Sequence, residues 1–541
     1  MDRVRMPQGR QFAVTWSIPD DYGGMTAAML QRSSAFSRLG GTPVDVLTFD
    51  ARPDTADLEQ RLRERGVLDP GVRLVNLYDW LRRRPLPGGA LKAERDVFTP
   101  LAEADATATR RRGDTVTSRV RSDDHGRTLQ VDHYRDDGTL VLSDRRDTRR
   151  RGVIGGRSIV LCDPHGRPVR SWARIWPLYT AWLDALTDRR QSFMIVDSKT
   201  IARFMVGYRR SHVITAHVVH ASHRSGAGDA HPVRASRRDV FEHLDGFDLV
   251  AVLTRGQAAD IEQDVGATPN LVVIPNSRPA AGVSAGRVRN RGGSPHPGDP
   301  RDPDRGVVLA TLTPRKRVSH AIDAVQRARG IGSEAGAGGA AAGLRLDVYG
   351  DGESHAALER RIRDDPAVRL HGFDPDARRE FATASFLLLT SRSEGSPLVL
   401  VEAMAAGCLP IAYDIRYGPS DLIRNGRNGY LVPAGDVDAL AAAMGRLREL
   451  PSRRVEAMRC AAMRSARRFD EARVTQIWAR ELHRSAVRRR LRRSPKLRHV
   501  RELTARSRVA ASVRTVVVNV VTAFGSGRGS RGREKTGTSR G

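Results

Sequence analysis

Cysteines, aromatic residues and long apolar runs are all scarce in this chain of 541 residues. The three cysteines, Cys162, Cys408 and Cys460, lie far apart and form no Cys-x-x-Cys pair. A sparse, odd set argues against a disulfide framework and a cysteine-ligated zinc site, and is typical of a reducing compartment. Because aromatic residues make up only 5% of the chain, its cores are expected to be aliphatic.

No run in the sequence approaches the about 18 apolar residues that a transmembrane helix needs. The apolar piece near the start, residues 12–16, is also too short for the core of a signal peptide. We therefore expect a cytoplasmic protein that does not span a membrane, with the inner face of the cell membrane as a surface it can bind.

Positive charge is concentrated at the end of the chain. Residues 484–541 hold 17 Lys and Arg against two Asp and Glu, and so carry +15 of the net charge of +29. This tail is the candidate for binding a polyanion. Its segments 488–493 (RRRLRR) and 516–521 (apolar) could lie on an anionic membrane surface. A solvated tail with no fixed structure fits the composition equally well.

Alternating strands and helices predict two α/β halves. An apolar strand at 11–16, a Gly-Gly loop, a helix from Thr26 to Leu39 and a strand at 44–49 form a βαβ unit, which implies a parallel sheet. The same pattern resumes after residue 176 and again after residue 306. We therefore predict two Rossmann-like domains facing a cleft, where the carboxyl ends of the strands bind ligands.

Between these halves the pattern changes twice. Hairpin signals such as Asp137-Gly138 separate alternating strands at 128–134, 139–143 and 158–162, which predicts an antiparallel β insertion. The predicted order is an N-terminal Rossmann-like domain, first part (1–79), the β-rich insertion (80–175), the second part of that domain (176–279), a linker (280–305), a C-terminal donor-binding domain (306–455), a terminal helix (456–485) and the basic tail (486–541).

The chemistry is carried most clearly by the segment from Glu394 to Glu402. Ser396 suits a helix N-cap, Pro397 suits the first helical position, and Gly407 can end the helix in a left-handed conformation. Glu394 then lies in the loop before the helix, and Glu402 on its second turn.

The backbone amides of residues 395–398 would form an exposed, electropositive helix start, which suits a phosphate or a sugar hydroxyl. Glu402 could accept hydrogen bonds from two adjacent hydroxyls, as a ribose offers. Taken alone, the same pattern could be a capped helix with two solvated glutamates.

The wider segment 391–433 (SRSEGSPLVLVEAMAAGCLPIAYDIRYGPSDLIRNGRNGYLVP) resembles the donor site of retaining GT-B glycosyltransferases of family 4. The resemblance implies a GT-B fold and a UDP-sugar co-substrate, with no metal and no further cofactor. It places Glu402 at the nucleotide ribose and Glu394 near the donor sugar. The continuation 413–421 resembles the branch of poly(glycerol-phosphate) α-glucosyltransferases and the related enzymes of accessory secretion systems.

Further site residues follow from this resemblance, which spans roughly residues 10 to 480. Lys316 matches the family lysine at the donor diphosphate, but Thr311 stands where the family usually has an arginine and cannot supply its charge. The implied catalytic residues are His220 and Glu394, and the implied donor-binding residues are Gly23, Gly24, Arg315, Lys316, Gly350, Gly395, Ser396, Pro397, Leu398 and Glu402.

The function implied is the transfer of a hexose, glucose or N-acetylglucosamine, from a UDP-sugar to a polyol-phosphate polymer, with retention of configuration. A Ser/Thr-rich protein is the alternative acceptor. A basic nucleic-acid-binding protein with a decayed transferase fold is a third reading, although no recognition helix or aromatic basic platform is evident. In some relatives the β insertion mediates homo-oligomerisation and acceptor binding; a generic pair of hairpins would explain its strands equally well.

Overall fold

The computed structural model describes residues 3–52, 54–87, 89–91, 98–225, 232–278, 301–333, 343–363 and 365–493. The chain divides into two compact units, Met1–His483 and Arg484–Gly541. Of the second unit, only the end of helix α14 (Glu471–Arg493) is described. Most of the predicted linker and nearly all of the basic tail therefore lie outside the described residues.

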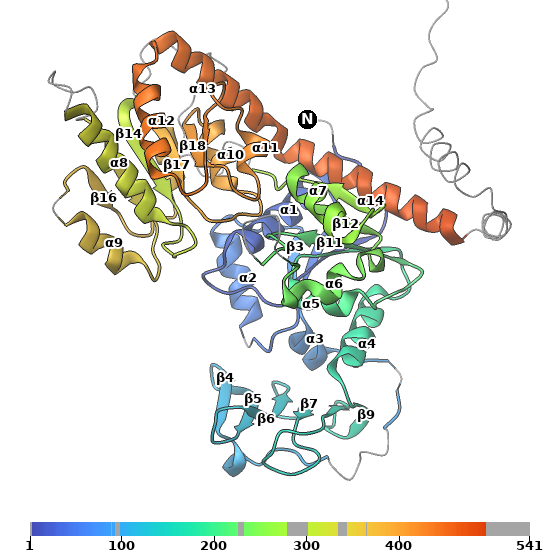
Figure 1. The fold of residues 1–541 in the computed structure, drawn as a ribbon. Helices are drawn as coiled ribbons and strands as arrows, with labels where there is room; N and C mark the ends of the chain where they lie inside the picture. Colours follow the sequence, from blue (N-terminus) through green and yellow to red (C-terminus); the bar gives the residue numbers. More distant parts are fainter. Residues whose placement is uncertain are drawn as a thin grey trace, which may run out of the picture. The chain divides into compact units, whose positions relative to one another are not determined.

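The first half of the larger unit is built on a seven-stranded sheet (Figure 1). Every neighbouring pair is parallel, because each strand is followed by a crossover with a helix before the next strand of this sheet. In spatial order the strands are β13 (Leu271–Val273), β12 (Leu249–Val252), β11 (Val213–Val219), β10 (Ser192–Val196), β1 (Arg10–Val14), β2 (Val44–Thr48) and β3 (Val72–Asn76).

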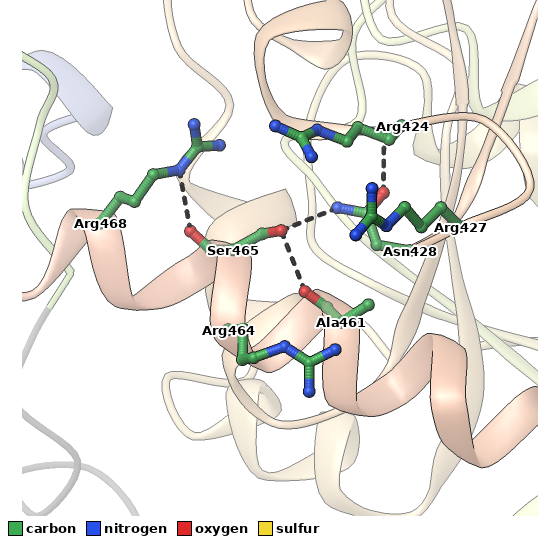
Figure 2. Close-up of a pocket in the computed structure, with 7 residues that line it drawn as sticks. All are labelled: Arg424, Arg427, Asn428, Ala461, Arg464, Ser465 and Arg468. Carbon is green, nitrogen blue, oxygen red and sulfur yellow. Dashed lines mark hydrogen bonds between the residues drawn. The ribbon is translucent and has the colours of Figure 1, made fainter.

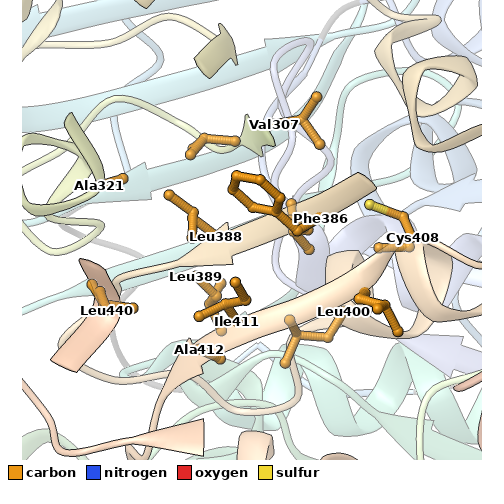
Figure 3. Close-up of a cluster of buried hydrophobic side chains, with 14 of the residues drawn as sticks. Val307, Ala321, Phe386, Leu388, Leu389, Leu400, Cys408, Ile411, Ala412 and Leu440 are labelled. Carbon is orange, nitrogen blue, oxygen red and sulfur yellow. The ribbon is translucent and has the colours of Figure 1, made fainter. Parts of the chain in front are cut away.

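The second half contains a six-stranded parallel sheet. Its apolar runs are buried on both faces, as expected for a sheet covered by helices, and Figure 3 shows part of the resulting core. Gly306 faces Phe386 across the sheet, and a Cβ there would lie 2.3 Å from the Phe386 ring. In spatial order the strands are β16 (Val368–Leu370), β15 (Arg345–Tyr349), β14 (Asp302–Leu309), β17 (Ala384–Leu389), β18 (Leu409–Tyr413) and β19 (Tyr430–Val432).

A third, antiparallel sheet interrupts the first half. It lies beside helices α3 (Leu77–Arg83) and α4 (Ile175–Thr187) (Figure 1), and Tyr78 of α3 stacks on His133 with ring centroids 4.2 Å apart. The fold class predicted from the sequence, two parallel α/β halves with an antiparallel insertion, is confirmed. The strands run as a meander of β4 (Ala108–Arg112), β5 (Thr115–Ser122), β6 (Thr128–Tyr134), β7 (Leu140–Arg145), β8 (Ser158–Cys162) and β9 (Pro168–Trp172).

Two local expectations were wrong. Strand β14 begins at Asp302, inside the predicted linker. The single helix expected from Val455 to Arg484 is divided into α13 (Ser452–Ala466) and α14. The break follows from pairing with a distant segment, because the Arg278 amide donates to the Phe469 carbonyl (2.9 Å) and its guanidinium forms an ion pair with Asp470.

No helix in the described part of the chain is long and apolar enough to cross a membrane. The remaining helices cover the two parallel sheets. They are α1 (Gly24–Gly40), α2 (Thr55–Glu64), α5 (Lys199–Met205), α6 (Arg238–Phe241), α7 (Arg255–Val265), α8 (Val318–Ser333), α9 (His355–Ile362), α10 (Leu398–Ala405), α11 (Pro419–Leu422) and α12 (Val437–Glu449).

Candidate active site

Glu394 follows strand β17 and forms the centre of a cluster of charges. Its carboxylate lies 2.7 Å from the Lys316 ammonium and 3.2 Å from the Arg315 guanidinium, and only 12% of its side chain is exposed. Burial alone would raise the pKa of Glu394, but the charges of Lys316 and Arg315 outweigh it and lower the pKa below its usual range. The structure therefore brings together three of the predicted site residues as an ionised group.

The backbone of the Glu394 loop is fixed on both sides. Its amide donates to the Arg416 carbonyl (3.1 Å), and the Tyr417 amide donates to the Glu394 carbonyl (2.8 Å). Gly395 lies directly against the other half of the molecule, since a Cβ there would be only 1.8 Å from the carbonyl oxygen of His220. The two predicted catalytic residues thus belong to loops whose backbones are in contact.

His220 is held from behind by a buried charge pair. Its Nε2 lies 2.7 Å from Asp197 Oδ1, and the Arg32 guanidinium binds both oxygens of Asp197, at 2.9 and 2.6 Å. Burial would raise the pKa of Asp197, but Arg32 and His220 together lower it to about 2. An ionised Asp197 can accept a hydrogen bond from Nε2–H, and in that tautomer of an uncharged ring the Nδ1 atom would be an acceptor.

That Nδ1 atom is buried and has no hydrogen-bond partner among the described residues. The His220 side chain as a whole is 7% exposed, and a buried polar atom without a partner is uncommon in a folded protein. His217 and His223 each have one structural partner, and the Nδ1 atom of His223 is likewise buried without a partner among the described residues. His217 Nδ1 lies 3.0 Å from the Val196 carbonyl oxygen, and the His223 Nε2 atom lies 2.8 Å from Asp264.

Helix α10 carries the second glutamate of the motif. It starts at Leu398 with Pro397 at the N-cap, and no side chain caps it, so the prediction that Ser396 is the cap was wrong. The open amides remain an electropositive helix start. Gly407 ends the helix with φ 80°, as expected. The carboxylate of Glu402 is 2.9 Å from the Arg378 guanidinium, a contact that was not predicted from the sequence.

The predicted glycines have different surroundings. Gly23 caps α1 and Gly24 starts it, and a Cβ at either position would meet nothing within 4 Å. No described contact joins them to the Glu394 cluster. Gly350 has a positive φ of 137°, and a Cβ there would lie 1.8 Å from the Ala310 carbonyl oxygen, so packing alone requires this glycine. Thr311, next to that carbonyl, is exposed.

Sequence reasoning missed the residues that support the site from behind, namely Asp197, Arg32 and Arg378. Asp197 directly follows strand β10, at the carboxyl edge of the parallel sheet, and this position was the available signal. Within the described ranges, no group of three or more His, Cys, Asp or Glu side chains could hold a metal ion.

Besides the Glu394 cluster, a cavity of about 450 Å³ lies between the carboxyl edge of the first sheet and the β insertion. Two of its tryptophans, Trp16 and Trp176, are 38% and 50% exposed. Aromatic faces of this kind stack on the apolar faces of polyols and sugars, and arginines bind phosphates. Asp144, which also lines the cavity, pairs with Arg146 and Arg157, and Asp50 is a second acid of the lining. The aromatic and basic residues of the lining are Trp16, Phe49, Tyr78, His133, Trp176, Tyr179, Phe204, Arg110, Arg146 and Arg157.

Comparison with known families and proteins gives two kinds of match. The family described as Glycosyl transferases group 1 matches residues 304–449. An exopolysaccharide phosphotransferase of Streptomyces coelicolor is 31% identical over 50% of this chain, but the chain spans only 27% of that protein. The poly(glycerol-phosphate) alpha-glucosyltransferase of Bacillus subtilis is 20% identical over 81% of this chain and 70% of its own length.

Two solved structures share the fold over 88% of this chain and 99% of theirs. The crystal structure of TarM from S. aureus superposes with a TM-score of 0.69 at 17% identity. The pneumococcal O-GlcNAc transferase GtfA, in complex with UDP and GlcNAc, superposes with a TM-score of 0.61 at 19% identity. At these identities the likeness shows the fold alone, and that fold is GT-B, as predicted.

Proposed function

Since residues 304–449 belong to the Glycosyl transferases group 1 family, we propose that this protein transfers a hexose from a UDP-sugar to a polyol-phosphate polymer, with retention of configuration. The observation that carries the proposal is the contact of Gly395 with the His220 carbonyl. It supports a single reaction centre in which Lys316, Glu394 and His220, from the two α/β halves, act on one substrate.

The donor would be held along the second half. The Lys316 ammonium, the Arg315 guanidinium and the open amides at the start of α10 would stabilise the charge that develops on the leaving diphosphate. These groups supply positive charge where other transferases use a metal ion. Glu402 would accept the ribose hydroxyls after releasing or sharing Arg378, from which it is now 2.9 Å away.

His220 would bind a hydroxyl of the donor sugar or of the acceptor through its free Nδ1 atom. The ionised Asp197 holds the ring in the tautomer that makes this possible. The attacking acceptor hydroxyl would approach from the face on which the diphosphate leaves, which is the geometry that retention requires without an enzyme nucleophile.

The acceptor would occupy the cavity of about 450 Å³ beside the β insertion. Its aromatic walls suit a polyol and its arginines suit phosphodiesters, which favours a polymer such as the acceptor of the B. subtilis relative. A Ser/Thr-rich protein is the second candidate, since GtfA is an O-GlcNAc transferase. Incubation with labelled UDP-sugar and either poly(glycerol phosphate) or a Ser/Thr-rich peptide distinguishes the two by which acceptor becomes labelled.

Two further parts of the proposal concern the cell. The protein would act in the cytoplasm, at the inner face of the membrane, through its basic tail, and the insertion would mediate self-association. Flotation of the full chain with anionic vesicles, compared with a chain ending at residue 485, tests the first part. Light scattering of the full chain gives the oligomeric state directly.

The donor site is tested by a screen of UDP release across UDP-sugars, followed by Lys316→Ala and Glu402→Ala in the purified full chain. Each substitution is expected to lower transfer at least 100-fold. Arg453→Ala and Glu359→Ala remove the same charges from exposed positions of α13 and α9, and should leave transfer unchanged. Near-normal turnover in folded Lys316→Ala and Glu402→Ala proteins would refute the assignment.

A further inference from the structure

Four arginines converge on one pocket at the surface of the second half, away from the Glu394 cluster. Arg424 and Arg427 belong to the loop between α11 and β19, Arg464 lies in the last turn of α13, and Arg468 lies in the 3-10 turn that follows it (Figure 2). The pocket has a volume of about 220 Å³, and Asn428, Ala461 and Ser465 complete its lining. None of these seven residues is among the predicted donor-binding residues, although Arg424, Arg427 and Asn428 lie within the segment 391–433.

The helix side of the pocket follows from helical spacing. Ala461, Arg464, Ser465 and Arg468 are three and four residues apart, so they share one face of α13 and its following turn. On the loop side, the Arg427 amide donates to the Arg424 carbonyl (2.9 Å), which turns the chain so that both arginines border the same space. All four arginine residues are exposed to solvent.

A buried asparagine forms the floor and connects the two sides. Asn428 is 1% exposed. Its side-chain oxygen accepts from the Arg424 amide (2.7 Å), and its nitrogen donates to Ser465 Oγ (3.0 Å). Ser465 Oγ in turn donates to the Ala461 carbonyl (2.9 Å). Loop and helix are therefore held at a fixed separation, and the pocket exists before any ligand binds (Figure 2).

The positive charge of this pocket is not balanced locally. In the part of the chain that the structure describes, none of the four guanidiniums forms an ion pair with a carboxylate. Arg468 donates to the backbone carbonyls of Ser465 and Asp421, both at 3.3 Å. The nearby Asp421 carboxylate instead accepts the Arg255 amide at 3.1 Å. Burial, together with the charges of Arg424 and Arg255, lowers the pKa of Arg468, as expected where cations face one another.

We propose that this pocket binds the phosphate group of a soluble ligand. A phosphate offers several oxygens in a tetrahedral arrangement, so guanidiniums can bind it from two sides. A planar carboxylate has only two oxygens, and one or two guanidiniums already saturate them. A soluble source is favoured over a lipid headgroup because the exposed large apolar side chains of the described residues lie elsewhere, so nothing beside the pocket would insert into a bilayer.

The proposal does not depend on the transferase activity, so the two can fail separately. Inorganic phosphate and glycerol 3-phosphate are titrated calorimetrically into the full chain, its Arg424→Gln/Arg464→Gln variant and an Arg453→Gln/Arg454→Gln control. The control removes the same charge from exposed positions at the other end of α13. The basic tail is present in all three proteins, so its binding cancels in the comparison.

We expect the pocket variant to bind phosphate at least tenfold more weakly, and the control to match the unmodified chain. Equally weaker phosphate binding by both variants would overturn the proposal, because the loss would then follow from the lower net charge and not from the pocket. A pocket-dependent gain in binding to vesicles of anionic phospholipid, without pocket-dependent binding of either soluble phosphate, would also overturn it in favour of a lipid surface.

Discussion

The contact between Gly395 and His220 can be tested with a single methyl group. In Gly395→Ala, the new Cβ would lie 1.8 Å from the His220 carbonyl oxygen, 2.7 Å from its carbonyl carbon and 3.2 Å from the Ala221 Cα atom. All three atoms belong to the backbone, so no side-chain rotation can make room. To reach ordinary contact at 3.4 Å, one loop must retreat from the other by about 1.6 Å.

This retreat would separate the two halves of the proposed reaction centre. Misplacement of reacting groups by about 1 Å can lower a rate about 100-fold. We therefore expect Gly395→Ala to lower hexose transfer at least that much, measured as acceptor labelling from UDP-sugar at saturating donor. The substitution acts at the surface between the loops, so circular dichroism and thermal unfolding should show a folded protein.

Gly445→Ala is the matched control. Gly445 lies in helix α12 of the same half, where a Cβ would meet nothing within 4 Å. It should leave transfer unchanged and stabilise the helix by about 1 kcal/mol. If folded Gly395→Ala transfers sugar as fast as the control, the His220 and Glu394 loops do not have to meet during the reaction, and the single reaction centre would have to be abandoned.

Three further outcomes follow from buried or exposed side chains. Burial raises the pKa of Asp50 to about 6 from 3.8. Ionising Asp50 therefore costs the folded state stability, which is fully present below about pH 4 and is lost as the pH rises through 6. The free energy of unfolding of Asp50→Asn, relative to the unmodified chain, should rise by about 1 kcal/mol between pH 5 and pH 8, and a constant difference would contradict this. Asp197→Asn leaves the buried Arg32 guanidinium without its charge partner and should lower the free energy of unfolding in denaturant by about 3 kcal/mol. Asp239→Asn breaks an exposed ion pair and should lower it by under about 1 kcal/mol. Equal losses would contradict the assignment of Asp197 and Arg32 as a buried ion pair. Trp176→Ala should raise the KM for the polymer several-fold without changing UDP-sugar hydrolysis. Phe373→Ala, at an even more exposed apolar site, should change neither, and an unchanged KM for Trp176→Ala would place the acceptor elsewhere.

The sequence predicts most strands of the two parallel sheets because their signals are local. Apolar runs bounded by glycines and turns indicate all of these strands except β3, and the Asp137-Gly138 turn lies between β6 and β7 as predicted. In the antiparallel sheet, β4, β5 and β9 were not predicted, because their sequences are rich in arginine and polar residues. The pairing of Lys316 with Glu394 could also be anticipated in outline, since both were assigned to the donor. Their 2.7 Å contact joins residues 78 positions apart, so the contact itself could be identified only from the three-dimensional structure.

The errors have long-range causes. Ser396 does not cap α10, and the chain packs tightly at its start: a Cβ on Gly418 would lie 2.3 Å from the Pro397 ring. Arg278 interrupts the predicted terminal helix from almost 200 positions away. Asp197 stood at the right end of a strand, but only the bidentate contact with Arg32 distinguishes it from other acids at sheet edges. The propensities of neighbouring residues do not indicate contacts with residues that are distant in the sequence.

The ion pairs already present in the donor site bear on its selectivity in a cell full of phosphates. Lys316 is engaged by Glu394, which also pairs with Arg315, and Glu402 is engaged by Arg378, so each of the two glutamates already has a cationic partner. A free phosphate would have to displace the carboxylate of Glu394 and would gain nothing at Glu402. In the proposed function, a UDP-sugar would offer its diphosphate to Lys316 and its ribose to Glu402 at once. The resting ion pairs would then favour ligands that carry both groups over free phosphate or a free sugar.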